Sequence, residues 1–362
     1  MSTIELQNLT KSFGDLTAVN NVSLKVDENE VLCLLGPSGC GKTTTLRMVA
    51  GLEIATSGNI LIDNKNVNEL ETRDRNLAMA FQFYALYPSL TVGENLANPL
   101  HAENLSEKEI KEKIFEIADI LQLREIINRK PHQLAEGEKQ RVAVGRAIIR
   151  DPQCFLFDEP LSRLDVQLRE QMRGQIKEVL SDLNKATVIV THDQLEALTM
   201  ATKIAVMRDG LIEQISSPHD IFAKPENTFV AGFIGTPQMN IADCNISNIN
   251  SSVLEISLLN QKIEIDFGKT LDINKNENYF LGVRPRSFDL VDAETNESLS
   301  GEVDLIENMG SEVLLHINSN NASFRTVQSR SHKIKVGEKI YLKPKKSQVH
   351  LFNSDGKVIA HG

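Results

Sequence analysis

Cysteines are few in this sequence, and long apolar runs are missing. The four cysteines are scattered along the chain, without C-x-x-C spacing: Cys33, Cys40, Cys154 and Cys244. This spacing argues against a disulfide framework or a zinc site and fits a reduced cytosol. Apolar runs such as Val31–Leu35 are much shorter than the roughly 20 residues that a membrane-spanning helix needs. Residues 1–30 show no basic start followed by an apolar core, so we expect no secretory signal.

Positive charge is also in short supply. Lysine and arginine number 39 against 49 acidic residues, which gives a net charge of −10. Binding to duplex nucleic acid depends on cations that neutralise phosphates, so we expect no nucleic acid partner. The chain has 362 residues, of which 41% are hydrophobic and 24% charged, as is ordinary for a soluble globular protein. This length exceeds what one core usually organises and predicts two domains.

The first domain is expected over residues 1–235. Continuous apolar runs at Val31–Leu35, 154–157 and 187–190 indicate strands covered on both faces of a parallel sheet. Amphipathic segments lie between them, and Ser106 with Glu109 forms a capping-box pattern before one such segment. Strand–helix alternation predicts an α/β fold, with a helical subdomain over about residues 88–150.

The second domain is expected over residues 240–362, where the pattern changes. Short, partly alternating segments separated by turn residues predict a small antiparallel barrel or sandwich. The predicted strands are 252–258, 262–267, 301–305, 312–317 and 348–352.

A phosphate-binding motif, G-x-x-x-x-G-K-[ST], follows the first apolar run and opens a helical segment over 44–50. It consists of Gly36, Pro37, Ser38, Gly39, Cys40, Gly41, Lys42 and Thr43. Glycines let backbone N–H groups converge on phosphate oxygens, and a helix N-terminus favours negative charge. We expect Lys42 to reach the terminal phosphates of ATP and Thr43 to ligate Mg²⁺.

Three further side chains follow apolar runs that are predicted strands. Asp158 and Glu159 end the run over 154–157, and His192 follows the run over 187–190. Asp158 is placed to hold Mg²⁺, and Glu159 to act as general base on the attacking water. Ligands bind at the carboxyl edge of α/β sheets, which brings His192 into the same candidate site.

With these residues in place, the chain resembles the ATP-binding subunit of an ATP-binding-cassette (ABC) importer, and closely the sugar-importing subfamily. The shared landmarks are, in chain order, Phe13, the phosphate loop with Thr44, Gln82, residues 134–141, residues 162–165 and His192. Residues 217–240 and 282–285 are particularly like the sugar importers. The resemblance implies a β-rich, OB-like regulatory domain at the carboxyl end.

The family also implies roles for these landmarks. Phe13 matches the aromatic residue that stacks on adenine, and Gln82 the glutamine that reaches Mg²⁺ and relays to the membrane subunit. His192 matches the switch histidine. The ligand set implied for Mg²⁺ is Thr43, Gln82 and Asp158, and the catalytic set is Lys42, Gln82, Glu159 and His192. Across the dimer, the resemblance assigns nucleotide contacts to Ala135, Gly137 and Asp165.

One landmark departs from the family pattern, which reads Leu-Ser-Gly-Gly followed by Gln or Glu. Ala135 replaces the serine that bonds the γ-phosphate of the opposite subunit, and Glu136 replaces the first glycine. Either Glu136 places a carboxylate close to that anion, at a cost of a few kcal/mol in a partly dry site, or it points outward and backbone amides suffice. Because the phosphate-loop side is complete, pairing with a second, different ATPase is favoured over a homodimer.

The resemblance further implies two membrane permeases, contacted through residues 83–88 and the helices up to about residue 150, and indirectly a solute-binding protein. The chain would sit peripherally on the cytoplasmic face of the inner (plasma) membrane. Its solute would be a carbohydrate, polyol or glycerol-phosphate-type compound. Two alternatives remain: a catalytically weak or regulatory cassette subunit, and a soluble cassette ATPase acting on DNA or ribosomes.

Overall fold

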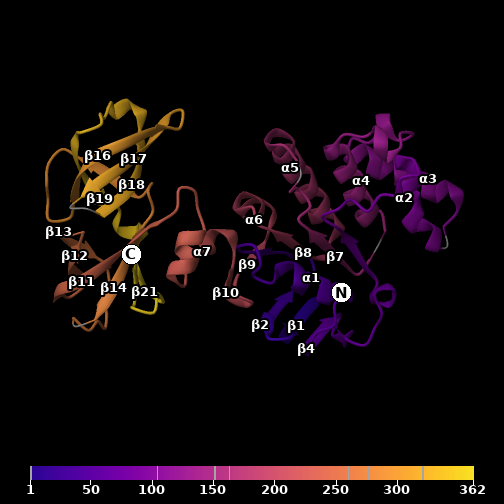
Figure 1. The fold of residues 1–362 in the computed structure, drawn as a ribbon, viewed down its shortest axis with the longest axis horizontal. Coiled ribbons are helices and arrows are strands. Elements are labelled where there is room, and N and C mark those ends of the chain that lie inside the picture. Colours follow the sequence, from indigo (N-terminus) through magenta and orange to yellow (C-terminus); the bar gives the residue numbers. More distant parts are fainter. Residues whose placement is uncertain are drawn as a thin grey trace. The chain divides into compact units, whose positions relative to one another are not determined.

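A computed structural model of the chain describes residues 2–103, 105–150, 152–162, 164–259, 261–275, 277–319 and 322–362. The chain divides into two compact units, residues 1–219 and 220–362 (Figure 1). Residues 220–235, expected in the first domain, thus fall in unit 2. Within the described residues, no helix combines the length and the apolar character that crossing a membrane requires.

Unit 1 is built on a six-stranded sheet with the order β10-β9-β3-β8-β7-β6. All neighbours pair in parallel except β10, which is antiparallel to β9. The strands are β3 (Val31–Leu35), β6 (Leu77–Ala80), β7 (Cys154–Asp158), β8 (Ala186–Thr191), β9 (Lys203–Arg208) and β10 (Leu211–Ser216). The predicted parallel sheet, with its three apolar strands, is therefore confirmed.

Both faces of this sheet are covered, because its central strands are buried along their whole length. On β7, Phe155 and Phe157 join the core beneath the helical segments, while Cys154 and Leu156 join the core on the other face. Alternate side chains of a strand point to opposite faces, so a buried strand of this kind is apolar at nearly every position. The polar residue on β7 is Asp158, at its end, and β8 also buries Thr187 and Thr191.

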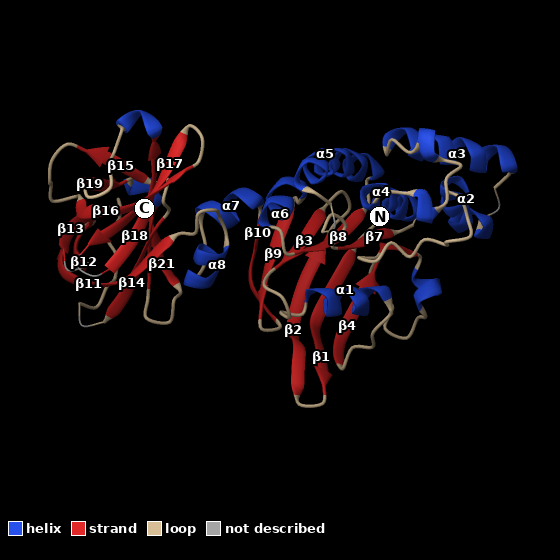
Figure 2. Ribbon diagram, turned by 45° about the horizontal axis from the view of Figure 1, so that its top comes forward, coloured by secondary structure: helices blue, strands red, loops and turns tan. Residues whose placement is uncertain are grey.

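A second sheet is antiparallel and has the order β2-β1-β4-β5 (Figure 2). Together with α1 (Lys42–Ala50), it contributes to the core that contains Cys154 and Leu156. Its strands are β1 (Ile4–Phe13), β2 (Leu16–Val26), β4 (Ser57–Ile62) and β5 (Lys65–Asn66). These strands were not among those predicted. The β1–β2 hairpin turns at Gly14, whose φ of +57° is in the left-handed region.

The helices of unit 1 follow the expected pattern. They are α2 (Val92–Ala97), α3 (Glu107–Ile120), α4 (Glu136–Ile148), α5 (Val166–Leu183) and α6 (Gln194–Met200). The predicted capping box before α3 is confirmed, since Ser106 N donates to Glu109 Oε2 at 2.8 Å and Glu109 N donates to Ser106 Oγ at 3.4 Å. Helices α2, α3 and α4 lie in the segment predicted to be a helical subdomain.

Unit 2 consists of short helices and two antiparallel sheets, and the two sheets share one core. Helix α7 (Pro218–Ala223) crosses the division between the units, and α8 (Thr228–Phe233) follows it. The sheets have the orders β13-β12-β11-β14-β20-β21 and β15-β19-β16-β17-β18. Leu281 from the first sheet and Leu315 from the second are buried in the shared core.

Five of these strands were predicted: β12 (Val253–Leu258), β13 (Gln261–Asp266), β16 (Leu299–Asn308), β17 (Glu312–Ser319) and β20 (Val349–Phe352). The others are β11 (Asn240–Asn250), β14 (Asn278–Val283), β15 (Phe288–Val291), β18 (Ala322–Ser329), β19 (Lys339–Pro344) and β21 (Val358–His361).

A buried arginine ties residues 222–234 to the sheets of unit 2. Arg284 donates from Nη1 to Ile234 O and from Nη2 to Phe222 O, both at 2.6 Å. Its guanidinium carbon lies 3.7 Å from the centroid of the Phe222 ring. Burial lowers the pKa of Arg284 to about 10, which still leaves the group charged at neutral pH. The arginine therefore satisfies two carbonyls that follow the observed division at residue 219 and precede the boundary expected from the sequence.

Arg284→Met should destabilise unit 2 by about 2–4 kcal/mol, because two charge-assisted hydrogen bonds are lost and two carbonyls stay unsatisfied. Hydrogen exchange of β14 and β20 amides in the full chain measures this loss. The matched control is Arg286→Met, since exposed Arg286 pairs only at the surface with Glu312 and should cost under about 1 kcal/mol. Equal effects of the two changes would contradict a special role for Arg284.

Candidate nucleotide site

The phosphate loop joins β3 to α1 through glycines that no other residue could replace. Gly41 has a φ of +101°, and a Cβ there would lie 2.3 Å from Ala18 O. A Cβ on Gly36 would lie 2.2 Å from Met207 O. Pro37, Ser38 and Gly39 are exposed, whereas their neighbours are buried. The loop thus packs closely on its inner side and presents an open outer side. Helix α1 begins at Lys42, two residues earlier than expected.

Lys42 and Thr43 follow the loop directly. The Lys42 ammonium is buried and donates to the carbonyls of Gly36 at 2.8 Å and Pro37 at 2.9 Å. Thr43 Oγ1 donates to Asp158 Oδ1 at 3.2 Å. Burial raises the pKa of Asp158, and the Thr43 hydroxyl opposes that shift. The start of α1 therefore carries the Lys42 ammonium and the Thr43 hydroxyl, and that hydroxyl is hydrogen-bonded to the Asp158 carboxylate at the end of β7.

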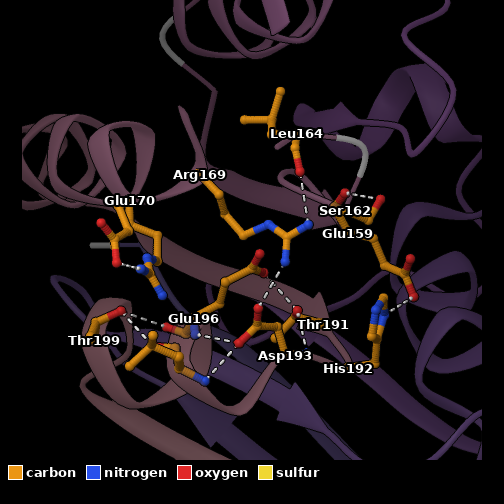
Figure 3. A network of polar contacts seen from close by, with 12 residues as sticks. Glu159, Ser162, Leu164, Arg169, Glu170, Thr191, His192, Asp193, Glu196 and Thr199 are labelled. Atoms are coloured by element: carbon orange, nitrogen blue, oxygen red, sulfur yellow. Dashed lines mark hydrogen bonds and ion pairs between the residues drawn. The ribbon is translucent and has the colours of Figure 1, made fainter. Parts of the chain in front are cut away.

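Glu159, directly after β7, is held by partners on both carboxylate oxygens. Gln82 Nε2 donates to Oε2 at 2.8 Å. His192 Nδ1 lies 3.2 Å from Oε1 (Figure 3). The backbone of Glu159 has a φ of +49°, and its N–H donates to Val190 O at 2.9 Å. A glutamate in the left-handed region is uncommon, and such backbone strain concentrates at functional sites.

The topology explains how these residues meet. The phosphate loop, Gln82, Glu159 and His192 each follow the carboxyl end of a parallel strand, and those strands are β3, β6, β7 and β8. These four strands are consecutive neighbours in the sheet. The structure thus brings together the phosphate-loop side of the predicted site at one sheet edge.

Arg169 on α5 is a residue that the sequence reasoning missed. Figure 3 shows its guanidinium between the two loops that precede α5 and α6: Nη2 donates to Leu164 O at 2.9 Å, and Nη1 to Asp193 Oδ2 at 3.3 Å. Asp193 also caps α6, accepting from the N–H groups of Leu195 and Glu196. Sequence offered one weak signal, a cation one helical turn after Asp165.

The signature residues border a separate cavity of about 340 Å³. None of the described residues that line this cavity belongs to the phosphate loop. The lining residues are Ala135, Glu136, Gly137, Glu138, Arg141, Leu164, Asp165 and Leu168. Ala135 is the N-cap of α4 but has no side-chain acceptor for the helix amides. A Cβ on Gly137 would lie 2.2 Å from Leu168 Cδ2. Arg163, in the predicted loop over 162–165, lies outside the described residues.

Glu136 has partners within its own chain. Its Oε1 pairs with Lys139 Nζ at 2.7 Å, and its Oε2 accepts from the Tyr84 hydroxyl at 2.7 Å. Of the two sequence alternatives, a carboxylate close to the anion or one that points outward, these contacts favour the second.

Phe13, at the end of β1, is 47% exposed. Lys11 Nζ lies 4.7 Å from the centroid of its ring. An exposed aromatic residue contributes little to a core, so its ring is available for stacking.

The residues present fit a nucleotide with Mg²⁺. Among the described residues, no group of three or more His, Cys, Asp and Glu side chains could by itself hold a metal. Mg²⁺ at nucleotide sites commonly takes one or two carboxylates together with substrate phosphates. Asp158 with the Thr43 hydroxyl, beside a glycine loop that leaves its outer side open, provides that set.

Comparison with known proteins covers both units. A family model described as ABC transporter matches residues 19–162, and a TOBE domain model matches residues 281–352. The trehalose/maltose import ATP-binding protein of Thermococcus litoralis is 41% identical, over 99% of this chain and 100% of the relative. The sn-glycerol-3-phosphate import ATP-binding protein of Bordetella avium is 39% identical, over 98% of both chains.

Among solved structures, a dimeric ATP-binding cassette in a post-hydrolysis state, bound to ADP and Pi, is 31% identical. The TM-score is 0.55, and the match covers 59% of this chain and 98% of that cassette. Full-length relatives, the family models and the phosphate-loop geometry agree. This chain belongs to the ABC transporter ATPases, and a TOBE domain of β-strands follows its cassette.

Proposed function

We propose that this ATPase drives uptake of a carbohydrate, polyol or glycerol-phosphate-type solute through separate membrane subunits. The observation that carries the catalytic half is Glu159, bonded to both Gln82 and His192 at the edge that holds the phosphate loop. The solute class rests on the relatives along the full chain, whose names specify trehalose/maltose, sn-glycerol-3-phosphate and xylose/arabinose import.

In this proposal Lys42 and the loop amides hold the ATP phosphates. Thr43, Asp158 and Gln82 hold Mg²⁺, which neutralises phosphate charge when bound. Glu159 accepts a proton from the attacking water as general base. Gln82 and His192 each fix one of its oxygens and so orient it. Phe13 stacks on adenine, Thr44 assists the loop, and Ala135, Gly137 and Asp165 face nucleotide held by a second cassette.

The partners we propose are two permeases at the cytoplasmic face of the inner (plasma) membrane and, indirectly, a solute-binding protein. Residues 81–88 support a docking role, since Phe83 is 67% exposed and Phe81 and Tyr87 are also exposed. A cavity of about 180 Å³ borders the segment and is lined by Phe81, Tyr84 and Ala85 together with residues of β6 and α4. Exposed aromatic groups around a hollow are typical of protein interaction sites.

Glu159→Gln should lower ATP turnover by ~10²-fold or more while ATP still binds, because the amide keeps shape but lacks basicity. Steady-state hydrolysis and nucleotide binding by the assembled transporter measure the two effects. The matched control is Glu112→Gln on the exposed face of α3, which should leave turnover unchanged. Near-normal turnover by Glu159→Gln would remove Glu159 from the base role and favour a catalytically weak, regulatory subunit.

Phe13→Ala should weaken ATP binding by roughly 1–3 kcal/mol, as expected when base stacking is lost. Phe13→Tyr should bind normally. Leu16→Ala is the matched control, since Leu16 is an exposed apolar residue of the same hairpin, opposite Phe13 in the strand register. Unchanged nucleotide affinity in Phe13→Ala would show that the ring has another role.

We further propose that the second cassette is a different ATPase chain. Ala135 lacks the hydroxyl that family signatures direct at the γ-phosphate, and a lost hydrogen bond to a charged group costs ~1.5–3 kcal/mol. The phosphate-loop side keeps every element. A partner with an intact signature would complete one strong site with this phosphate loop.

Co-purification of the assembled transporter tests this pairing. Two distinct cassette chains in equal amounts are expected, and Glu159→Gln here should then abolish most hydrolysis. The equivalent change in the partner should matter much less. A single cassette species present in two copies would contradict the heteromeric pairing and would leave the proposal on the solute unchanged.

A further inference from the structure

The segment after β6 is fastened to α4 at two points. Near the start of α4, the Tyr84 hydroxyl donates to Glu136 Oε2 at 2.7 Å. Toward its end, Arg146 donates to Ala85 O, and its guanidinium carbon lies 4.9 Å from the centroid of the Tyr87 ring. Arg146 is ten positions after Glu136, about 15 Å along a helix. The segment therefore follows the helix rather than touching it once.

The same segment carries Gln82, which is bonded to Glu159. Only one residue separates Gln82 from Tyr84, so an anchored Tyr84 restricts where the Gln82 backbone can lie. No helix or strand holds residues 81–88. Side-chain anchors must therefore supply the order that secondary structure does not.

Glu136 is suited to be such an anchor. It is the first residue of α4, a fixed point on a packed helix. Lys139, three residues on, pairs with its Oε1 and leaves Oε2 for Tyr84. A hydrogen bond to an ionised acceptor is stronger than one between neutral groups. A glycine at this position, as the family pattern has it, could not make the contact.

We propose that Glu136 is a positioning residue for hydrolysis, which holds Gln82 against Glu159 by way of the Tyr84 hydroxyl. The role rests on the proposed function of Glu159 and Gln82. This role would also explain why a glutamate stands at this signature position. The contact links the first residue of α4 to the segment that carries Gln82, so a movement of α4 would shift that segment, and the reverse.

A double-mutant cycle, measured in the assembled transporter, tests the link. Tyr84→Phe removes only the hydroxyl, whereas Glu136→Ala removes the acceptor together with the ion pair to Lys139. Each should lower kcat about 3- to 10-fold with KM for ATP within about twofold, and the double variant should be no worse than the poorer single one. Tyr341→Phe in unit 2 is the matched control and should leave kcat unchanged.

Two further measurements separate positioning from general damage. On the residual activity of Gln82→Ala, Tyr84→Phe should have no additional effect, because the residue through which it acts is gone. Hydrogen exchange of amides 82–87, which needs no hydrolysis, should rise in both single variants. Additive losses in the cycle, a further loss on the Gln82→Ala background, or unchanged exchange would each overturn the proposal. An assembled wild-type transporter without hydrolysis would count instead against the proposed function, and the exchange measurement would still decide the contact.

Discussion

The carboxyl end of β7 constrains everything around it. Two carboxylates follow each other there, Asp158 buried and Glu159 at the surface of the sheet edge. Neighbouring anions at a partly dry site are costly unless each has a partner. Asp158 takes the Thr43 hydroxyl, and Glu159 takes Gln82 and His192. The partners come from three other strand ends, so the parallel sheet is what makes the pair tolerable.

Close backbone approach is the second constraint on the site. The phosphate loop packs against the carbonyls of Ala18 and Met207 so tightly that Gly41 and Gly36 have no room for a Cβ. That contact fixes the loop from behind while its outer residues remain exposed. A rigid loop with free amides binds phosphate without having to be ordered first. The antiparallel sheet, through Ala18 on β2, thus has a direct part in shaping the nucleotide site.

The signature side of the site differs from the family pattern at the start of α4. Ala135 has lost an acceptor and a hydroxyl, and α4 begins without a side-chain cap. Glu138 compensates in part by accepting from Ala135 N at 2.8 Å. Glu136, which looks from the sequence like a charge aimed at ATP, has Lys139 and Tyr84 as partners in its own chain. The energetic cost of the Glu136 carboxylate near a bound nucleotide therefore has to be judged from these contacts and not from the motif alone.

Sequence by itself determined the parallel sheet, the phosphate loop, and the position of Asp158, Glu159 and His192 at strand ends, because a continuous apolar run that ends in a polar residue is a local signal. Only the tertiary structure decided which of these residues touch, and it added Arg169, Arg284 and the partners of Glu136. It also revealed strands such as β1 and β2. Several of those contacts join residues far apart in the chain, and no local pattern encodes a partner that is 52 residues away, as Tyr84 is from Glu136.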